Sequence, residues 1–293
     1  MMRPKVILRL GMFFLIGAFS QSGLAGKVPS IVCQGNKTYR TEEIIRGLYP
    51  HPDMIAALQS NQTPREIESL AERLIQSGYR EGGFPNVEVT CKTVEGGLSV
   101  RIAEGTRYKC DGIEIIRERS FADDALIRHL TSPQPQENTH LDFEFRGGER
   151  VTVYRDAQGD ERDLREAVWV KDWPIDFNGS FDQPVIEAIA GLGFIDAKVA
   201  TSLELDDHDE TAELVIKVIE QGAPATIKQI KLGGRTTQAH EDLIQFTDLR
   251  LGQICSSELI HRTSETLWES GRFHSIRIFF KPKKCHLVMK LRN

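Results

Sequence analysis

The sequence lacks the short motifs that mark the common classes of enzyme. Its 293 residues contain no Gly-x-Ser-x-Gly nucleophile elbow, no glycine-rich phosphate loop and no His-Glu-x-x-His signature. The eight histidines are scattered along the chain rather than clustered. We therefore predict a protein that is not an enzyme, with no catalytic residues, no cofactor and no metal site.

An excess of positive charge is also missing. The chain has 37 Lys and Arg residues against 42 Asp and Glu residues, which gives a formal net charge of −5. Nucleic acids are bound by concentrated basic surfaces, so we predict no nucleic-acid partner. Beyond the N-terminus, no apolar run approaches the roughly 20 residues that a membrane-spanning helix needs.

Cysteine is scarce, and its five copies are widely spaced: Cys33, Cys91, Cys110, Cys255 and Cys285. This spacing does not fit a zinc site, in which pairs of ligands lie a few residues apart. An odd number leaves at least one thiol free or paired between chains. Buried free thiols are the simplest interpretation, and the disulfide pairing is left open.

Residues 1–25 are typical of a secretory signal peptide. A basic start precedes the short apolar run Gly11–Phe19, and Ala25 provides a small residue at a cleavage point. Cleavage would make Gly26 the new N-terminus, and no cysteine is there to carry a lipid. The alternative is an uncleaved segment that anchors the chain in a membrane.

One pattern occurs three times after the signal peptide. Its first copy begins with a capping box, in which Thr63 and Glu66 flank Pro64, and continues as a helix with one apolar stripe. Two runs of alternating apolar residues follow and predict strands with one buried face. The second copy opens near Asp182 and the third near Ser256 or Ser257.

Each copy is preceded by a predicted strand and a further predicted helix. Every repeat therefore has the order β-α-α-β-β, and two helices would cover one face of a three-stranded mixed sheet. We predict an α+β protein with three modules, at residues 26–106, 107–222 and 223–293. Few contacts should cross the joints between modules.

The second repeat carries an insertion at about residues 132–178. Leu141–Phe145 and Val151–Tyr154 alternate around a Gly-Gly pair, which predicts a β-hairpin. Ala167–Val170 could add a third strand. The pattern does not indicate what the insertion does.

Three features together resemble the polypeptide-transport-associated (POTRA) domains of outer-membrane β-barrel assembly and translocation proteins. The first is the tandem β-α-α-β-β order behind a signal peptide. The second is a helix end followed by glycine and an aromatic residue, as in Gly83-Phe84, Gly193-Phe194 and Ser270-Gly271-Arg272-Phe273. The third is a strand that closes on Glu-Gly, as in Glu104-Gly105.

The sequence departs from the POTRA pattern in two respects. One is the insertion in the second repeat. The other is that the chain stops at Asn293 without the alternating strands of a membrane barrel, which run to about ten residues each. We expect either a POTRA-only protein beside a separate outer-membrane β-barrel or the periplasmic part of a longer precursor.

The resemblance implies that the second strand of each repeat is an open sheet edge that binds polypeptide. Open edges carry unpaired backbone N–H and C=O groups, which an extended client can pair with. These edges are expected at about Asn86–Thr90, Lys198–Glu204 and Ser275–Phe280. The implied polypeptide-binding residues, acting mainly through backbone, are Val87, Glu88, Val89, Lys198, Val199, Ile276, Arg277 and Ile278.

The implied function is that of a periplasmic scaffold, associated with the outer membrane, that binds unfolded outer-membrane or secreted polypeptides. One alternative is an envelope or division protein held by an uncleaved anchor. Another is an envelope enzyme whose site lies in the insertion, with His140, Asp142, Glu144 and Asp172 as candidates.

Two charged runs complete the candidates. Asp206–Glu210 could hold calcium, but it lies where a hairpin should turn, and a solvated turn is the favoured interpretation. Lys281–Lys284 occupies the equivalent turn of the third repeat. It could contact a membrane surface, although a solubilising hairpin tip is again favoured.

Overall fold

The computed structural model describes residues 30–60, 62–116, 122–136, 139–147, 149–156, 158–236, 238–273, 275–281 and 286–292. The predicted signal peptide, Cys285 and most of the basic run Lys281–Lys284 lie outside these residues. The chain divides into two compact units. One contains residues up to Gly112 with Lys171–Ser180 and Glu204–Glu213, and the other contains Ile113–Val170, Phe181–Leu203 and Leu214–Asn293.

Three of the sheets share one strand order, in which the last strand of the repeat is central. The first contains β1 (Ser30–Gln34), β3 (Gly97–Ala103) and β2 (Glu88–Val94), the second β4 (Lys109–Ile116), β10 (Thr211–Glu220) and β9 (Lys198–Asp206), and the third β12 (Gln229–Arg235), β14 (His286–Arg292) and β13 (Ser275–Lys281), each in that order. In the first and third sheets the outer pairs are parallel on one side and antiparallel on the other. The predicted α+β class with small mixed sheets is confirmed.

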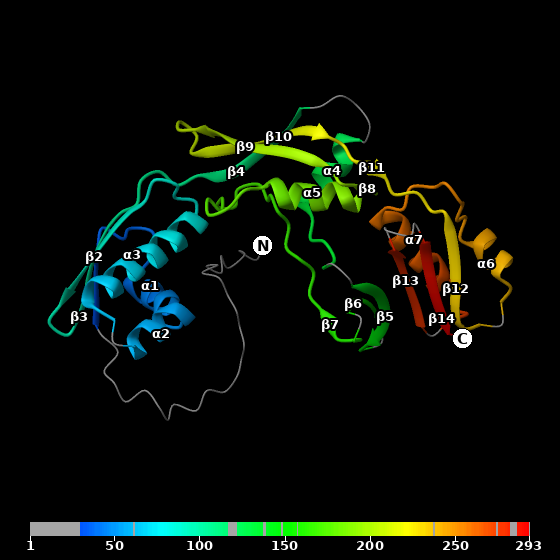
Figure 1. Ribbon diagram of the computed structural model, residues 1–293, viewed down its shortest axis with the longest axis horizontal. Coiled ribbons are helices and arrows are strands. Elements are labelled where there is room, and N and C mark those ends of the chain that lie inside the picture. Colours follow the sequence, from blue (N-terminus) through cyan, green and yellow to red (C-terminus); the bar gives the residue numbers. More distant parts are fainter. Residues whose placement is uncertain are drawn as a thin grey trace. The chain divides into compact units, whose positions relative to one another are not determined.

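The helices lie between the first and second strands of each repeat (Figure 1). They are α1 (Thr41–Leu48), α2 (Pro52–Gln59) and α3 (Pro64–Glu81), then α4 (Asp123–Thr131) and α5 (Asp182–Gly191), then α6 (His240–Phe246) and α7 (Ser257–Glu269). Two helices per repeat were predicted, and the first repeat has a third, α2. Its signal was present in the sequence, because His51 accepts the N–H of Asp53 as N-cap and Pro52 stands at the first helical position.

The capping box predicted for α3 is formed. Thr63 accepts the N–H of Glu66, and the Glu66 carboxylate accepts the N–H of Thr63 at 2.7 Å. In the third repeat, the Ser256 hydroxyl caps α7 by accepting the N–H of Leu259 at 3.1 Å. These caps fix where each helix starts relative to the strand that follows it.

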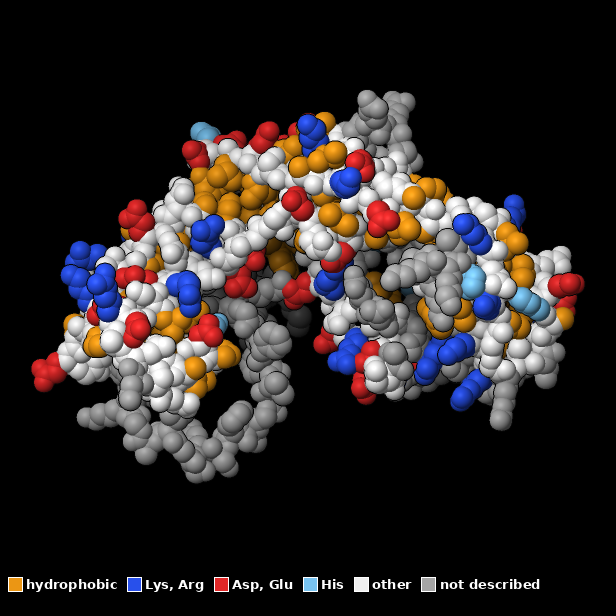
Figure 2. All heavy atoms as spheres, viewed as in Figure 1, with side chains coloured by type: hydrophobic (Ala, Val, Ile, Leu, Met, Phe, Trp, Pro, Cys, Tyr) orange, Lys and Arg blue, Asp and Glu red, His pale blue; other side chains and the backbone are white. Residues whose placement is uncertain are grey.

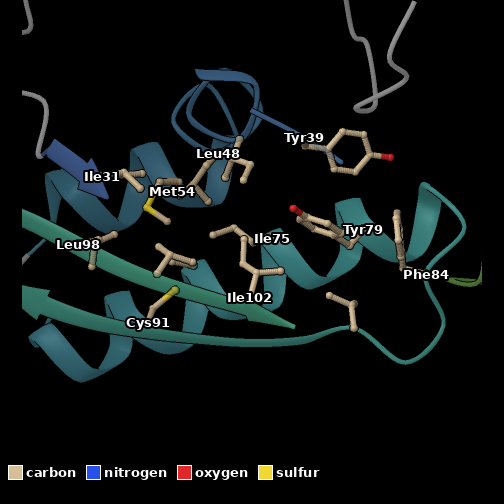
Figure 3. Close-up of a cluster of buried hydrophobic side chains, with 14 residues drawn as sticks. Ile31, Tyr39, Leu48, Met54, Ile75, Tyr79, Phe84, Cys91, Leu98 and Ile102 are labelled. Atoms are coloured by element: carbon tan, nitrogen blue, oxygen red, sulfur yellow. The ribbon is translucent and has the colours of Figure 1, made fainter. Parts of the chain in front are cut away.

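The core of the first repeat explains the glycine–aromatic motif. Tyr79, at the end of α3, packs edge to face on Tyr39 and on Phe84, with ring centroids 5.0 and 5.4 Å apart (Figure 3). Phe84 is 2 % exposed. Gly83 turns the chain with φ +98°, which lets Phe84 fold back under the helix end.

The closing Glu-Gly motif also has a structural role. The Glu104 carboxylate accepts the Thr38 N–H at 2.9 Å and the Tyr79 hydroxyl at 3.1 Å. Glu104 therefore ties the last strand of the first repeat to the turn after its first strand. Burial, followed by the negative charge of Glu104, raises the pKa of Tyr79 and keeps this hydroxyl a donor.

Glycines at the end of the first strand are required by close packing. Gly35 and Gly234 have φ +87° and +97°, and a Cβ at either would lie 2.0 Å from a carbonyl oxygen of the central strand. The Gly234→Ala change should therefore lower the free energy of unfolding by about 1–3 kcal/mol. Urea unfolding of the variant measures this loss.

Gly271→Ala is the matched control, because its φ is also positive at +65° but nothing lies within 4 Å of the added Cβ. Its loss should be the smaller of the two. Equal losses would show that the backbone angle, and not the close approach of the central strand, sets the cost.

The cysteines described by the structure are free thiols: Cys33, Cys91, Cys110 and Cys255. Cys33 and Cys91 both stand opposite Val100, on either side of the central strand. Two strand spacings separate them by roughly 9.6 Å, beyond the reach of about 7 Å for a disulfide.

We expect Cys91 and Cys255 to resist alkylation in the folded protein. Burial raises the pKa of each thiol to about 12, so almost no thiolate is present at neutral pH. Mass spectrometry after brief iodoacetamide treatment, with and without urea, measures this. Rapid labelling of either thiol in the native state would contradict it.

The predicted hairpin of the insertion is confirmed as β5 (His140–Arg146) and β6 (Glu149–Arg155). The third strand is β7 (Glu161–Arg162), and the strand suggested for Ala167–Val170 is wrong. Trp169 lies there instead as a buried anchor, 1 % exposed, with its ring 5.4 Å from that of Phe181.

The joint near residue 106 is held by the returning arm of the insertion. Cys110 donates its N–H to the Trp173 carbonyl at 2.8 Å, beside the start of β4. The Arg80 guanidinium donates to the Phe177 carbonyl at 2.8 Å, and the Phe177 N–H donates to the Arg80 carbonyl at 3.1 Å. The expectation of few contacts at this joint is therefore wrong.

The joint near residue 222 is also bonded. β8 (Phe194–Ile195) pairs with β11 (Ala223–Pro224) as a short antiparallel ladder. Beyond it, the Cys255 N–H donates to the Ala225 carbonyl at 2.9 Å. Few contacts were expected here too, and that expectation is wrong because both neighbouring repeats contribute backbone to the joint.

Candidate functional site

The second strand of each repeat lies at the edge of its sheet. β2, β9 and β13 each have one ladder neighbour, namely β3, β10 and β14. This is the placement that the resemblance to POTRA domains implied. It brings the proposed binding residues to three separate edges and does not gather them into one pocket.

A row of polar side chains on α3 runs along the open side of β2. The Glu68 carboxylate accepts the Thr93 N–H at 2.6 Å, and the Glu72 carboxylate accepts the Cys91 N–H at 2.8 Å. One further helical turn along, Gln76 donates to the carbonyl of Val87 at 3.0 Å. Residues four apart share one face of a helix, so α3 presents all three to the strand.

The pKa of Glu68 is lowered mainly by the bond from the Thr93 N–H, which favours the ionised carboxylate. Glu68, Glu72 and Gln76 were not predicted as site residues. Their spacing of four residues beside the apolar stripe of α3 was visible in the sequence. Only the structure shows that β2 runs next to them.

The row leaves one gap, at Val89. Backbone groups in an antiparallel pair point alternately toward and away from the partner strand. Cys91 and Thr93 point away from β3, so Val89 does too. Among the described residues no side chain accepts the Val89 N–H, and this position is the open part of the β2 edge.

The same alternation corrects the expectation for Glu88. Glu88 lies opposite Ala103 in the ladder, and its backbone points toward β3 rather than toward the rim. Its side chain is exposed. Val87, which was grouped with the edge, precedes β2 and is 2 % exposed in the core.

The β9 edge is partly covered in a similar way. Asp182, at the start of α5, accepts both the N–H and the hydroxyl of Thr201 at 2.7 Å. Lys198 pairs with Glu220 at 2.8 Å on the exposed surface, where such a pair contributes little to stability. Val199 is half-buried, with its side chain on the helix side like that of Thr201.

In both β2 and β9, the residues whose side chains face the helices are those whose backbone faces the rim. Backbone chirality couples the two directions, so the rule applies to β13 as well. Ile276 and Ile278 are 1 % and 2 % exposed in the core, and their backbone groups point to the rim. The backbone of Arg277 points to β14 instead, opposite Lys290.

The structure gives the other candidates little support. Figure 2 shows acidic side chains at the free end of the β9–β10 hairpin, where Asp206 accepts the N–H groups of His208 and Asp209. Within the described part of the chain, no group of three His, Cys, Asp or Glu residues could hold a metal ion. In the insertion, Asp142 forms an ion pair with Arg155 at 3.6 Å.

The fold in these sheets is POTRA-like, with the β-α-α-β-β order and a central last strand. No protein-family model matches the sequence. No helix among the described residues is long and apolar enough to cross a membrane.

Several solved structures are similar to this chain. One is POTRA3-5 of BamA from Haemophilus influenzae, with 16 % identity, 92 % of this chain and 100 % of that chain covered, and a TM-score of 0.35. Another is the N-terminal domain of Omp85 from Thermosynechococcus elongatus, with 12 % identity, 90 % and 97 % covered, and a TM-score of 0.34. CdiB from Escherichia coli has 13 % identity, with 83 % of this chain but 35 % of CdiB covered, and a TM-score of 0.25.

Proposed function

We propose that this protein is a non-enzymatic periplasmic scaffold that binds extended polypeptides along open sheet edges during outer-membrane protein assembly or polypeptide secretion. The observation that carries the proposal is the edge position of β2 and β9. An extended client pairs with backbone groups, so it is recognised with little regard to its side chains.

The partners would be unfolded outer-membrane or secreted polypeptides and a separate outer-membrane β-barrel protein. The binding positions are Val89 on β2 and Val199 on β9, whose backbone groups point to the rim. Glu88 and Lys198 flank these positions with exposed charged side chains, which restrain uncontrolled pairing between copies of the protein.

The test is a titration of the full chain with an unfolded peptide of about ten alternating apolar and polar residues, like a strand of an outer-membrane barrel. Hydrogen exchange followed by NMR should show new protection of the Val89 amide. The Thr90 amide, which already faces β3, should not change. Binding that protects neither β2 nor β9 would overturn the proposal.

A further inference from the structure

The inserted hairpin lies beside the open edge of the third sheet. Within one compact unit, Cα atoms of β5 and β13 approach within 8 Å along the two strands, and β5 also contacts α7. Figure 1 shows β5 on the side of β13 that faces away from β14. Strands of one sheet lie about 4.8 Å apart, so a strand inserted between β5 and β13 would need them roughly 9.6 Å apart.

The hairpin packs against the third repeat through its second strand as well. Val153 on β6 is 3 % exposed, and Tyr154 is half-buried. Burial raises the pKa of the Tyr154 hydroxyl, and the negative charge of Glu265 on α7 raises it further. Tyr154 therefore lies close enough to α7 to sense its charge.

The outer side of the inserted sheet is poorly suited to accept another strand. β7 is two residues long and carries charged side chains. Glu161 pairs with Arg146 at 2.6 Å, and Arg162 pairs with Asp156. Short, charged edge strands are a common way in which proteins prevent further pairing.

We propose that the inserted hairpin closes the open edge of β13, so that an incoming strand pairs with β2 or β9 but not with the third sheet. The closure itself is independent of the function proposed above, whereas the restriction on clients rests on it. Ile276, Arg277 and Ile278 then belong to a covered edge, and the insertion has a role that its sequence did not indicate.

The structure offers a clean way to remove the hairpin. Gln134 and Arg165 form an antiparallel bridge, with N–H to carbonyl distances of 2.9 and 2.7 Å in the two directions. Replacing residues 135–164 with Asn-Gly would close this bridge with a two-residue turn. Trp169 and the arm that holds the first joint stay in place.

A second variant keeps the chain intact. Val153→Asp puts a charge into the buried side of the hairpin and should unfold it. Thr152→Asp is the matched control, because Thr152 is exposed on the neighbouring position. Circular dichroism confirms that the rest of each variant is folded.

Hydrogen exchange of the Ile276 and Ile278 amides, without any peptide, tests the closure. Exchange should become at least about tenfold faster in the deletion and in Val153→Asp, and should stay unchanged in Thr152→Asp, because solvent reaches the rim only when the hairpin is gone. Unchanged exchange in both hairpin variants would overturn the proposal.

Addition of the barrel-strand peptide tests the restriction on clients. In the full chain it should protect Val89 but not Ile278, and in the deletion it should protect both. Protection of Ile278 in the full chain would show that the edge is open and would overturn the closure. If the peptide protects no edge in any variant, the proposed function fails, while the exchange result without peptide still decides the closure.

Discussion

Replacing Trp169 with alanine should lower the free energy of unfolding by about 3–5 kcal/mol, which is the usual cost of removing a large buried aromatic side chain. Trp169 is 1 % exposed and packs on Phe181. The N–H groups of Val168 and Trp169 both donate to the Leu130 carbonyl, at 2.8 and 3.0 Å. The side chain thus anchors the point where the insertion rejoins its repeat.

Urea unfolding followed by far-UV circular dichroism measures the loss. Trp173→Ala is the matched control, because it removes the same side chain from a position that is 48 % exposed. Its effect should stay within about 0.5 kcal/mol. Similar losses for the two variants would show that Trp169 is not a structural anchor.

Replacing Val89 with proline should weaken binding of the barrel-strand peptide about tenfold or more relative to Val89→Ala. Proline removes one N–H donor, and a client carbonyl left without its partner costs about 1–3 kcal/mol. Proline is tolerated here because the Val89 N–H points away from β3 and takes no part in the ladder. Val89→Ala controls for the lost packing of the side chain.

Glu88→Pro serves as the register control, because the Glu88 backbone faces β3 opposite Ala103. This change should destabilise the first sheet, which thermal unfolding detects, whereas Val89→Pro should leave the fold intact. Isothermal titration of peptide into each folded variant measures the binding. Equal affinity of Val89→Pro and Val89→Ala for the peptide would place the client site elsewhere.

The repeat order and most of the element positions could be predicted from local patterns. The Thr63–Glu66 capping box and the Ser256 cap mark helix starts through side chains only a few residues apart. The inserted hairpin followed from strict alternation around a Gly-Gly pair. Such signals depend on neighbours in the sequence, so they survive without knowledge of the tertiary structure.

The parts that were missed depend on contacts between distant residues. Trp169 lies in an alternating apolar stretch that resembles a strand, but its burial depends on Phe181 and its backbone on Leu130. Which way the backbone of Glu88 points follows from the α3 side chains that bond Cys91 and Thr93. The position of β5 beside β13 joins residues more than 100 positions apart, and no periodicity in the sequence records it.

The row of α3 side chains along β2 has a consequence for how long a client would stay. A client strand that paired along the whole edge would exchange two acceptors, the carboxylates of Glu68 and Glu72, for its own carbonyls. Exchanging one hydrogen bond for another gains little free energy, and bonds to charged acceptors are the stronger kind. Most of the gain would come from the single gap at Val89. The residence time would then be short, which suits a protein that hands its clients on rather than stores them.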